Sequence, residues 1–437
     1  MAVQAAVIGG GLAGCEAALQ LANVGIEVLL YEQKPLRYSP AHTYQGLAEL
    51  VCSNSLKAAR LESAAGLLKH EMELFDSVVV RSAKQCAVPA GGALAVDREQ
   101  FSNRMTREIE KHPNIQVVRE EVTAIPDIPC VIATGPLTEG KFADAIRTLL
   151  GTDYLSFYDA AAPIVTAESV DFTKAFAASR YGRGEDDYVN CPMNKEEYTR
   201  FHEALIGAER APLHDFDQSA PQVYEGCMPI EVLARRGEDA IRFGPLKPVG
   251  LTDPRTGHRP WAVVQLRREN SEGSLLNLVG FQTNLKFGEQ KRVFSMIPGL
   301  KEAEFVRYGV MHRNTFIDSP RLLDVRFCLK NHPGIYFAGQ MTGVEGYIES
   351  AASGILAGCN LARELTGKPS LELPRDTMMG ALSHYISDPS VCVFQPMGSN
   401  MGILPPLAER VRDKKERYAA IANRAMDSLR AYLAATD

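Results

Sequence analysis

The hydrophobic and polar positions over the first 32 residues predict a strand, a helix and a second strand. Residues 3–8 form a short apolar run that stops at a glycine-rich stretch, residues 9–14. Small and apolar residues at helical spacing follow over residues 16–22, and Gly25 marks the end of that helix. The apolar run of residues 26–32 is the second strand. The pattern therefore indicates one β-α-β unit, the building block of a parallel sheet.

Three later segments carry the same strand pattern, namely residues 115–118, 130–133 and 335–338. The last of these is followed by glycines and then by a helix of small residues, 350–365. We expect all three strands to join the sheet that the first unit begins.

The pattern changes between residues 156 and 325. Strands such as 261–266 and 277–282 mix there with polar helices such as 196–208. Since nucleotide-type motifs lie both before and after this region, we predict that it is a domain inserted into the first one.

The chain has 437 residues, with 47 Lys and Arg against 53 Asp and Glu, and a formal net charge of −6. Apolar residues make up 46% and charged residues 23%, which is typical of a soluble folded protein. No run approaches the ~20 apolar residues of a membrane-spanning helix, and the first residues lack the basic region of a secretory signal. We therefore expect a cytoplasmic protein without a membrane partner. A nucleic-acid partner stays possible, because local basic clusters can bind phosphate.

The glycines at positions 9, 11 and 14 fit the G-x-G-x-x-G motif between a strand and a helix. In this motif the first glycine permits a tight turn, the second lets backbone approach a pyrophosphate, and the third allows close helix–strand packing. Glu32 lies 18 residues past Gly14, at the end of the second strand, where a carboxylate would accept hydrogen bonds from a ribose. The sequence therefore predicts a dinucleotide site.

The motif alone does not separate NAD from FAD. Two further glycine-containing turns favour FAD, because an extended dinucleotide needs a second close approach of backbone. One is residues 133–135, and the other is residues 337–340 with Gly343 and Gly346 after it. The alternative for either turn is an ordinary strand-to-loop connection.

The predicted fold class is α/β. A discontinuous Rossmann-like FAD-binding domain comprises residues 1–155 and 326–370, and an inserted α+β domain for substrate or RNA comprises residues 156–325. A helical C-terminal segment, residues 371–437, is expected to pack on the FAD domain.

Nine cysteines without a C-x-x-C pair exclude zinc ribbons and thioredoxin-type dithiols as local motifs, and we expect no metal site. Seven of them lie in surroundings where an inert buried thiol is the expectation. Cys52 precedes three small polar residues, 53–55, which predict a helix N-cap and hence a thiol with a lowered pKa. Cys227 lies in a Gly- and Pro-containing turn before a predicted helix, 230–236. Core packing stays the alternative for both thiols.

His312 lies in a polar segment after a strand-like run, residues 306–310, and a surface histidine is the alternative to a functional one. A second polar feature is a basic cluster near the C-terminus, for which a solvated helix face is the alternative to RNA binding. The cluster comprises Arg410, Arg412, Lys414, Lys415 and Arg417.

Longer strings of residues extend this picture to one family. They run from about residue 3 to about residue 410 and comprise residues 9–16, 51–56, 89–98, 181–182, 190–193, 243–250, 307–314 and 337–354. With these strings the chain resembles the TrmFO family of folate- and FAD-dependent RNA uracil-5-methyltransferases, which are relatives of the GidA (MnmG) proteins.

The resemblance implies C5-methylation of the T-loop uridine of tRNA, which gives 5-methyluridine. It implies that 5,10-methylenetetrahydrofolate donates the one-carbon unit, that FAD carries it and supplies a hydride, and that NAD(P)H regenerates reduced flavin. Uracil C5 becomes nucleophilic when a thiolate adds at C6, so this chemistry needs a reactive cysteine.

The resemblance also implies which residues form the site. Cys227 matches the cysteine that attacks uracil, Cys52 matches the second catalytic cysteine, and His312 matches a position beside the folate. The residues implied in cofactor binding are Gly9, Gly10, Gly11, Leu12, Ala13, Gly14, Glu32, Gly339, Gly343, Glu345 and Gly346.

Residues 57–63 depart from the family's pattern, which leaves a ribosomal RNA uridine open as the alternative substrate. Two other classes stay open as well. One is an NAD(P)H-dependent flavin reductase with Cys52 and Cys227 as a redox pair, although the two cysteines are far apart in sequence. The other is an RNA-binding protein with a structural flavin. The sequence does not determine the oligomeric state or the choice between NADH and NADPH.

Overall fold

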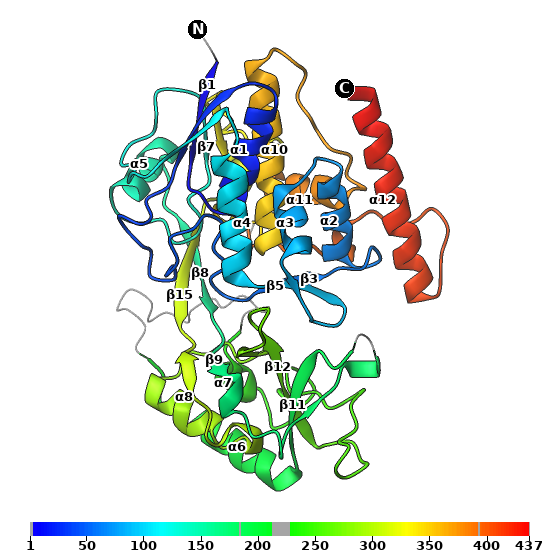
Figure 1. Ribbon diagram of the computed structural model, residues 1–437. Coiled ribbons are helices and arrows are strands. Elements are labelled where there is room, and N and C mark those ends of the chain that lie inside the picture. The colour runs from blue at the N-terminus through cyan, green and yellow to red at the C-terminus, as the bar shows by residue number, and fades with distance from the viewer. Residues whose placement is uncertain (1–2, 183–184, 212–227, 392–393, 437) are drawn as a thin grey trace.

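The computed structural model describes residues 3–182, 185–211, 228–391 and 394–436 (Figure 1). Two halves are visible. The upper half in Figure 1 holds both ends of the described chain, and the lower half is built from its middle.

Five parallel strands form the central sheet of the upper half. They are β1 (Gln4–Ile8), β2 (Glu27–Tyr31), β6 (Ile115–Val118), β7 (Cys130–Ile132) and β16 (Ile335–Phe337). Their order is β16-β7-β1-β2-β6, and every neighbouring pair is parallel. The central strand β1 is apolar because it is covered on both faces, and Ala5, Ala6 and Val7 are fully buried. The strands predicted from the hydrophobic pattern are confirmed, including β16, which lies some 200 residues after its neighbour β7.

The upper half also contains the helices α1 (Leu12–Asn23), α2 (Ala64–Glu73), α3 (Val78–Gln85), α4 (Arg98–Glu110), α5 (Gly140–Leu150), α9 (Ser319–Leu322), α10 (Tyr347–Leu365), α11 (Met378–Ser387) and α12 (Lys414–Thr436). Helices α1, α4 and α10 pack against the parallel sheet. The helix α1 predicted after the glycine-rich turn and the small-residue helix α10 after β16 are both present. Among the described helices none is both long and apolar enough to cross a bilayer.

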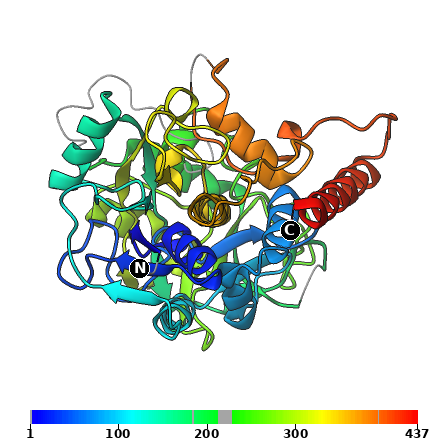
Figure 2. The ribbon, with the colours of Figure 1, turned by 90° about the horizontal axis from the view of Figure 1, so that it is seen from above.

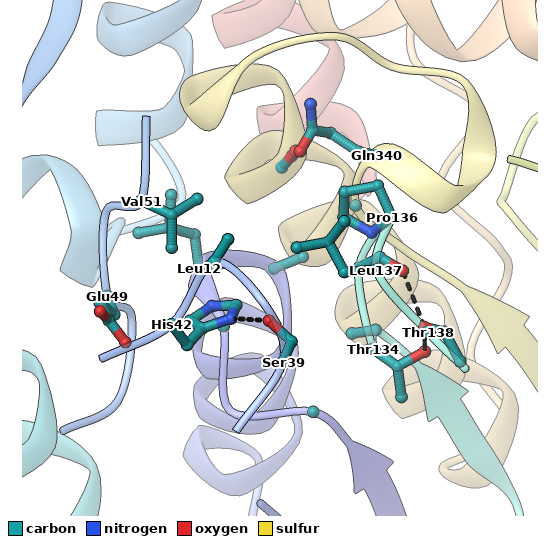
Figure 3. Close-up of a pocket in the computed structure, with 18 of the residues that line it drawn as sticks. Leu12, Ser39, His42, Glu49, Val51, Thr134, Pro136, Leu137, Thr138 and Gln340 are labelled. Carbon is teal, nitrogen blue, oxygen red and sulfur yellow. Dashed lines mark hydrogen bonds between the residues drawn. The ribbon is translucent and has the colours of Figure 1, made fainter. Parts of the chain in front are cut away.

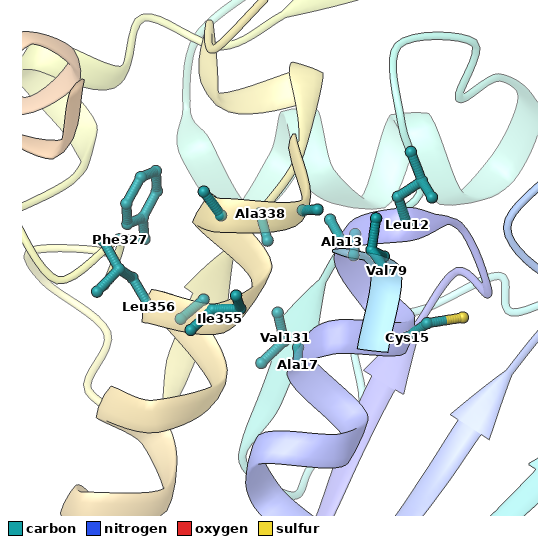
Figure 4. Close-up of a cluster of buried hydrophobic side chains, with 14 of the residues drawn as sticks. Leu12, Ala13, Cys15, Ala17, Val79, Val131, Phe327, Ala338, Ile355 and Leu356 are labelled. Atoms are coloured by element: carbon teal, nitrogen blue, oxygen red, sulfur yellow. The ribbon is translucent and has the colours of Figure 1, made fainter. Parts of the chain in front are cut away.

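Helices α1 and α10 pack against each other at unusually short range. A Cβ atom on Gly354 would lie 2.1 Å from the Ala13 carbonyl oxygen, and one on Gly358 would lie 2.7 Å from Ala17 Cα. Figure 4 shows Ala17 and Val131 between the two helices. The small residues of both helices are therefore required by a close helix crossing, which joins the first and the last parts of this half.

Six antiparallel strands form the sheet of the lower half. They are β9 (Ile164–Thr166), β10 (Phe176–Ala177), β11 (Tyr188–Met193), β12 (Ala262–Arg268), β13 (Leu275–Leu278) and β14 (Phe305–Arg307), in the order β10-β11-β12-β13-β9-β14. Helices α6 (Lys195–Gly207), α7 (Ile230–Ala234) and α8 (Phe287–Phe294) accompany this sheet. The half has a hydrophobic core of its own, in which Tyr198, Phe201, Phe281 and Phe294 are fully buried.

Two strands connect the halves. β8 (Leu155–Ala160) and β15 (Met311–Phe316) pair antiparallel and run between the two larger sheets (Figure 1). A fourth, three-stranded sheet lies beside this connection and consists of β3 (Ser55–Ala58), β4 (Ala87–Val88) and β5 (Ala93–Val96) in the order β3-β5-β4.

The C-terminal helix α12 lies along the side of the upper half (Figure 2). It packs on α2, and Ile421, Ala422 and Leu429 are buried in the same core as the parallel sheet. Its first turn begins within the basic cluster of residues 410–417, whose side chains are exposed or half-buried.

Candidate active site

The glycine-rich turn after β1 shows why its glycines are needed. A Cβ atom on Gly14 would lie 1.8 Å from the Gly9 carbonyl oxygen, so only glycine lets α1 start this close to the turn. Gly11, by contrast, has no atom within 4 Å of its Cβ position and faces open space at the N-terminus of α1. An anion placed there would meet backbone N–H groups and the positive end of the helix dipole.

Glu32 follows directly after β2 and is held from two sides. Its Oε2 accepts a hydrogen bond from the Gly10 N–H at 3.0 Å, and its Oε1 accepts one from the Lys34 N–H at 2.9 Å. The side chain is buried at the edge of a cavity. This is the position where a carboxylate binds the ribose of a dinucleotide.

A cavity of about 500 Å³ connects this turn to the junction of the two halves. That volume lies within the usual range of cofactor sites. Figure 3 shows one end of it, with Val51 and His42 on one side and Pro136 and Leu137 on the other. Of the residues named for the site from the sequence, those that line this cavity are Gly9, Gly10, Gly11, Leu12, Ala13, Glu32, Cys52, Gly339, Glu345 and Gly346.

Two of the expected cofactor residues do not line the cavity. Gly14 lies beneath the turn, where it allows the packing of α1 just described. Gly343 is packed against an aromatic ring, because a Cβ atom there would lie 2.3 Å from Cζ of Phe394. The structure therefore gives both glycines a supporting position behind the cavity wall.

The cavity is also lined by residues that the motif analysis missed. His42 and Ser39 lie at the Glu32 end, with the His42 Nδ1 and the Ser39 Oγ 2.5 Å apart, and burial lowers the pKa of His42. Opposite them, the Thr134 and Thr138 hydroxyls are 2.6 Å apart (Figure 3). These residues lie in ordinary polar loops, so no local signal in the sequence marks them.

Cys52 lies at the other end of the cavity, in a loop before β3. Its Sγ is 3.6 Å from the Ala160 carbonyl oxygen, and its N–H donates to the Tyr347 hydroxyl at 2.7 Å. Tyr347 belongs to α10 and also lines the cavity. Desolvation raises the pKa of the Tyr347 phenol well above its ordinary value, so this group is neutral at physiological pH.

The prediction that Cys52 begins a helix is wrong, because the strand β3 follows it. The polar residues that suggested an N-cap have other partners. Asn54 is fully buried, and its side-chain amide donates to the carbonyl oxygens of Val96 and Arg268 at 3.0 and 2.8 Å. Because these partners are distant in sequence, a local pattern could not reveal them.

Cys227 lies outside the described residues, but both ends of its segment are placed. The Ala211 N–H donates to the Asn284 carbonyl oxygen at 2.8 Å, and the Ile230 N–H donates to the Gln282 carbonyl oxygen at 2.7 Å. Gln282 lines the same cavity as Cys52.

His312 lies in β15, opposite Asp159 of β8 in the ladder between the halves. These two strands reach the cavity, since Asn314 of β15, Ala160 of β8 and the next residue, Ala161, line it. The strand therefore passes the Cys52 end of the site.

The other described cysteines are free thiols and lie away from the cavity lining. Burial raises the pKa of Cys130, Cys191 and Cys359 to about 12, so these thiols stay protonated at neutral pH. Within the described ranges no group of three or more His, Cys, Asp and Glu side chains could hold a metal ion.

A parallel sheet, a glycine-rich turn that leads into α1, a carboxylate at the end of β2 and a long cavity at the carboxyl ends of the strands define a Rossmann-like dinucleotide-binding protein. Comparison with known proteins agrees. Two crystal forms of Aquifex aeolicus GidA have the same fold, with TM-scores of 0.71 and 0.69 at 17% and 16% identity, and each match covers 99% of this chain and 73% or 76% of that one.

The sequence comparisons are more specific. The model of the family "Glucose inhibited division protein A" matches residues 4–369. The chain is 58% identical to the methylenetetrahydrofolate--tRNA-(uracil-5-)-methyltransferases TrmFO of Acetivibrio thermocellus, over 98% of both chains, and of Moorella thermoacetica, over 96% of both. The chain therefore belongs to the glucose inhibited division protein A family and, within it, to the TrmFO family.

Proposed function

We propose that this protein is an FAD-dependent methyltransferase that forms 5-methyluridine at the T-loop uridine of tRNA, with 5,10-methylenetetrahydrofolate as the one-carbon donor and NAD(P)H as the reductant. One observation carries the proposal. The chain is 58% identical, over 98% of its length, to a relative named for this reaction. The site supports it, because Cys52 lies in the same cavity as the dinucleotide motif.

The residues of the cavity fit FAD. The open space beside Gly11 would take the pyrophosphate, and Glu32 would bind the adenosine ribose. Gly339 and Gly346 line the far end of the cavity, where backbone would approach the flavin ring. When bound, reduced flavin would supply the one-carbon carrier and the hydride that the reaction requires.

The protein's own contribution is nucleophilic and acid–base chemistry. In our proposal Cys227 adds to C6 of the uracil, which makes C5 nucleophilic, and Cys52 assists the removal of the C5 proton. Ile230 is three positions after Cys227, so their Cα atoms are at most about 11 Å apart. Ile230 is hydrogen-bonded to Gln282 in the cavity wall, which supports a meeting of both thiols at one site.

For the folate we propose a place next to His312. This residue lies in β15, and Asn314 of the same strand lines the cavity that also contains Cys52. The resemblance to the family assigns this position to folate binding.

A tRNA substrate is favoured over ribosomal RNA by the names of the relatives. The segment that departs from the family's pattern, residues 57–63, has structural roles that account for part of its sequence. Lys57 pairs with the buried Glu349 at 2.7 Å, and the Ser63 hydroxyl accepts the Gly66 N–H at 3.2 Å at the start of α2. Because these residues have structural roles, their departure from the family's pattern does not imply a ribosomal RNA substrate.

The test is nucleoside mass spectrometry on unmodified tRNA and ribosomal RNA transcripts. Each is incubated with the flavin-loaded protein, NADPH and isotope-labelled methylenetetrahydrofolate. We expect labelled 5-methyluridine in tRNA, loss of more than 100-fold of the rate in Cys227→Ala and Cys52→Ala, and little change in the control Cys359→Ala. Label in ribosomal RNA alone would show that the substrate is ribosomal RNA and not tRNA. NADPH oxidation without label in either RNA would favour the flavin reductase.

A further inference from the structure

The loop that carries Cys52 is held by side chains from four separate elements. We call residues 50–54 the Cys52 loop. From α10, the Tyr347 hydroxyl accepts hydrogen bonds from the N–H groups of Cys52 and Ser53 at 2.7 and 3.2 Å. The other three elements contribute arginines.

Arg98, the first residue of α4, spans the Cys52 loop. Its Nη1 donates to the Leu50 carbonyl oxygen at 2.9 Å, and its Nη2 donates to the Cys52 carbonyl oxygen at 3.3 Å. The same guanidinium forms a two-pronged pair with Glu269, at 3.1 and 2.9 Å. Glu269 follows β12 directly, and its side chain is 3% exposed. Because α4 belongs to the upper half and β12 to the lower half, this pair also joins the two halves of the molecule.

Two more arginines complete the contacts. Arg307 of β14 donates to the Val51 carbonyl oxygen. Arg267 of β12 donates to the Ser53 hydroxyl at 2.9 Å and to the Asn54 side-chain oxygen at 3.0 Å. Each of the five residues of the loop therefore accepts a hydrogen bond from a guanidinium group.

The charges of this cluster do not balance. Among the described residues that form it, three guanidinium groups face one carboxylate, Glu269. Desolvation and the neighbouring Arg98 lower the pKa of Arg307, which shows the cost of bringing these cations together. A negative charge on Cys52 would reduce that cost. Among the described residues, Arg98 of α4, Arg307 of β14 and Tyr347 of α10 interact electrostatically with the thiol, and the Ala160 carbonyl oxygen of β8 lies 3.6 Å from its Sγ.

We propose that Arg98, Arg267, Arg307 and Glu269 form a guanidinium clamp that fixes the Cys52 loop and favours the ionised, nucleophilic form of Cys52. The four residues are positioning residues, because their contacts are to the loop. The inference rests on the proposed function in that it assumes a chemical role for Cys52. It adds that the lower half of the molecule, through Arg267, Glu269 and Arg307, sets the reactivity of a thiol carried by the upper half.

The test measures the thiol directly, without RNA or folate. The full-length, flavin-loaded protein is treated with iodoacetamide between pH 5.5 and 9.5, and peptide mass spectrometry gives the alkylation rate of Cys52 at each pH. The variants are Arg307→Gln, Arg307→Lys and Glu269→Gln. The matched control is Arg242→Gln, because Arg242 is also largely buried in the lower half, donates to the Trp261 carbonyl oxygen at 3.0 Å and lies outside the clamp.

Opposite shifts are expected for the two charge changes. Arg307→Gln removes a cation and should raise the pH midpoint of Cys52 alkylation by about one unit, which makes alkylation about tenfold slower at pH 7. Arg307→Lys keeps the charge and should restore most of the rate. Glu269→Gln removes the carboxylate of the clamp and should lower the midpoint. If the clamp only held the loop in place, both variants would loosen the loop and would shift the midpoint in the same direction.

The proposal is overturned if Arg307→Gln, like the control Arg242→Gln, leaves the pH midpoint of Cys52 alkylation unchanged. It is also overturned if Glu269→Gln and Arg307→Gln shift this midpoint in the same direction. If Arg307→Gln does not fold, the sign of the Glu269→Gln shift decides alone. A failure of the proposed function has a different readout. If Cys52 had no role in the reaction, Cys52→Ala would still form 5-methyluridine, and the alkylation of Cys52 would still test the clamp.

Discussion

Two glutamates near the glycine-rich turn show how environment separates the roles of identical side chains. Glu32 lies at the edge of the cavity and accepts two backbone N–H groups. Glu16 lies inside α1 and is fully buried, with its Oε1 accepting hydrogen bonds from the Ser77 hydroxyl and the Val79 N–H. Its Oε2 has no hydrogen-bond partner among the described residues. Desolvation raises the pKa of Glu16 to about 7.

This shift predicts a pH-dependent stability. The pKa of Glu16 in the folded protein is about 7, above its ordinary value of 4.5, so between these values the folded state holds a proton that the unfolded chain releases. The stabilisation is complete below pH 4.5 and is lost as the pH rises through 7. Glu16→Gln, which keeps the acceptor, should therefore be more stable than the unmodified protein at pH 8 by on the order of 3 kcal/mol and about equal to it at pH 5.

Urea unfolding at pH 5 and pH 8 checks this, with the exposed Glu302→Gln as the control. An equal effect of Glu16→Gln at both pH values would contradict the assignment.

At the scale of elements, the site depends on the crossing of α1 and α10. Helix α1 begins at the glycine-rich turn, and α10 begins directly after Gly346 in the far wall of the cavity. The distance between the two helices therefore fixes the spacing of the two ends of the cofactor site. Ser353 of α10 adds a direct tie, since its hydroxyl accepts the Gly339 N–H at 2.7 Å. Gly354 and Gly358 of α10 face Ala13 and Ala17 of α1 where the helices meet, because a bulky residue at these positions would force the helices apart.

A single methyl group should disturb this crossing. In Gly354→Ala the new Cβ would lie 2.1 Å from the backbone oxygen of Ala13, which cannot turn away as a side chain could. We expect a loss of about 2–3 kcal/mol of unfolding free energy and a lower content of bound FAD after purification. Denaturant unfolding and flavin absorbance measure the two effects.

Gly207→Ala is the control for this substitution. Gly207 ends α6 and has no atom within 4 Å of its Cβ position, so alanine should leave stability unchanged or raise it by up to about 1 kcal/mol. If both variants behave alike, helix propensity and not the helix crossing determines the result.

The described part of the molecule has two large hydrophobic cores, and the cavity runs from the upper half to the junction between them. The upper core surrounds the parallel sheet and the lower core surrounds the antiparallel sheet. The ladder of β8 and β15 and the guanidinium clamp connect them, and Cys52 lies in this connection. Reaction with an RNA base would therefore depend on how the two halves are held relative to each other.

The two cores should respond separately to a cavity-forming substitution. Phe281 is fully buried in the lower core, with its ring edge-on to Phe294 at 5.2 Å between centroids. Phe281→Ala should destabilise that core by about 3–5 kcal/mol. Bound flavin, which we place in the upper half, should then be released at a higher denaturant concentration than the one that unfolds the lower half.

Circular dichroism and flavin fluorescence in one denaturation series follow both events. Phe172→Ala, at a side chain that is 55% exposed, is the control. Simultaneous loss of both signals in Phe281→Ala would show that the molecule unfolds as one cooperative unit.

The part of the fold that could be predicted is the part with local periodicity. Residues 4–31 have apolar runs and a glycine turn whose meaning depends on neighbours in sequence, and the strands β6, β7 and β16 follow the same rule. The prediction of a helix after Cys52 was wrong because the contacts there are distant in sequence. The polar residues of this segment resemble an N-cap, but Asn54 is bonded to Val96 and Arg268, and β3 pairs with β5 almost 40 residues later.

The cavity shows the same division. Gly9, Gly11 and Glu32 could be predicted, because a phosphate-binding turn and its ribose carboxylate lie at fixed spacing in one β-α-β unit. His42 and Thr138 could not be, because loops that lie opposite each other in space carry no common pattern. The domain boundaries and the roles of Cys227 and His312 remain predictions.

By itself, the sequence determined the class of fold, the dinucleotide turn and, through its motifs, the family. These features follow from hydrophobic periodicity, from glycine geometry and from strings of residues that act over short spans. The tertiary structure alone decided which groups surround Cys52. Arg98, Arg267 and Arg307 are 46 to 256 residues away from the loop atoms they bind, and solvent exclusion, which makes their charges matter, exists only once the two halves have come together.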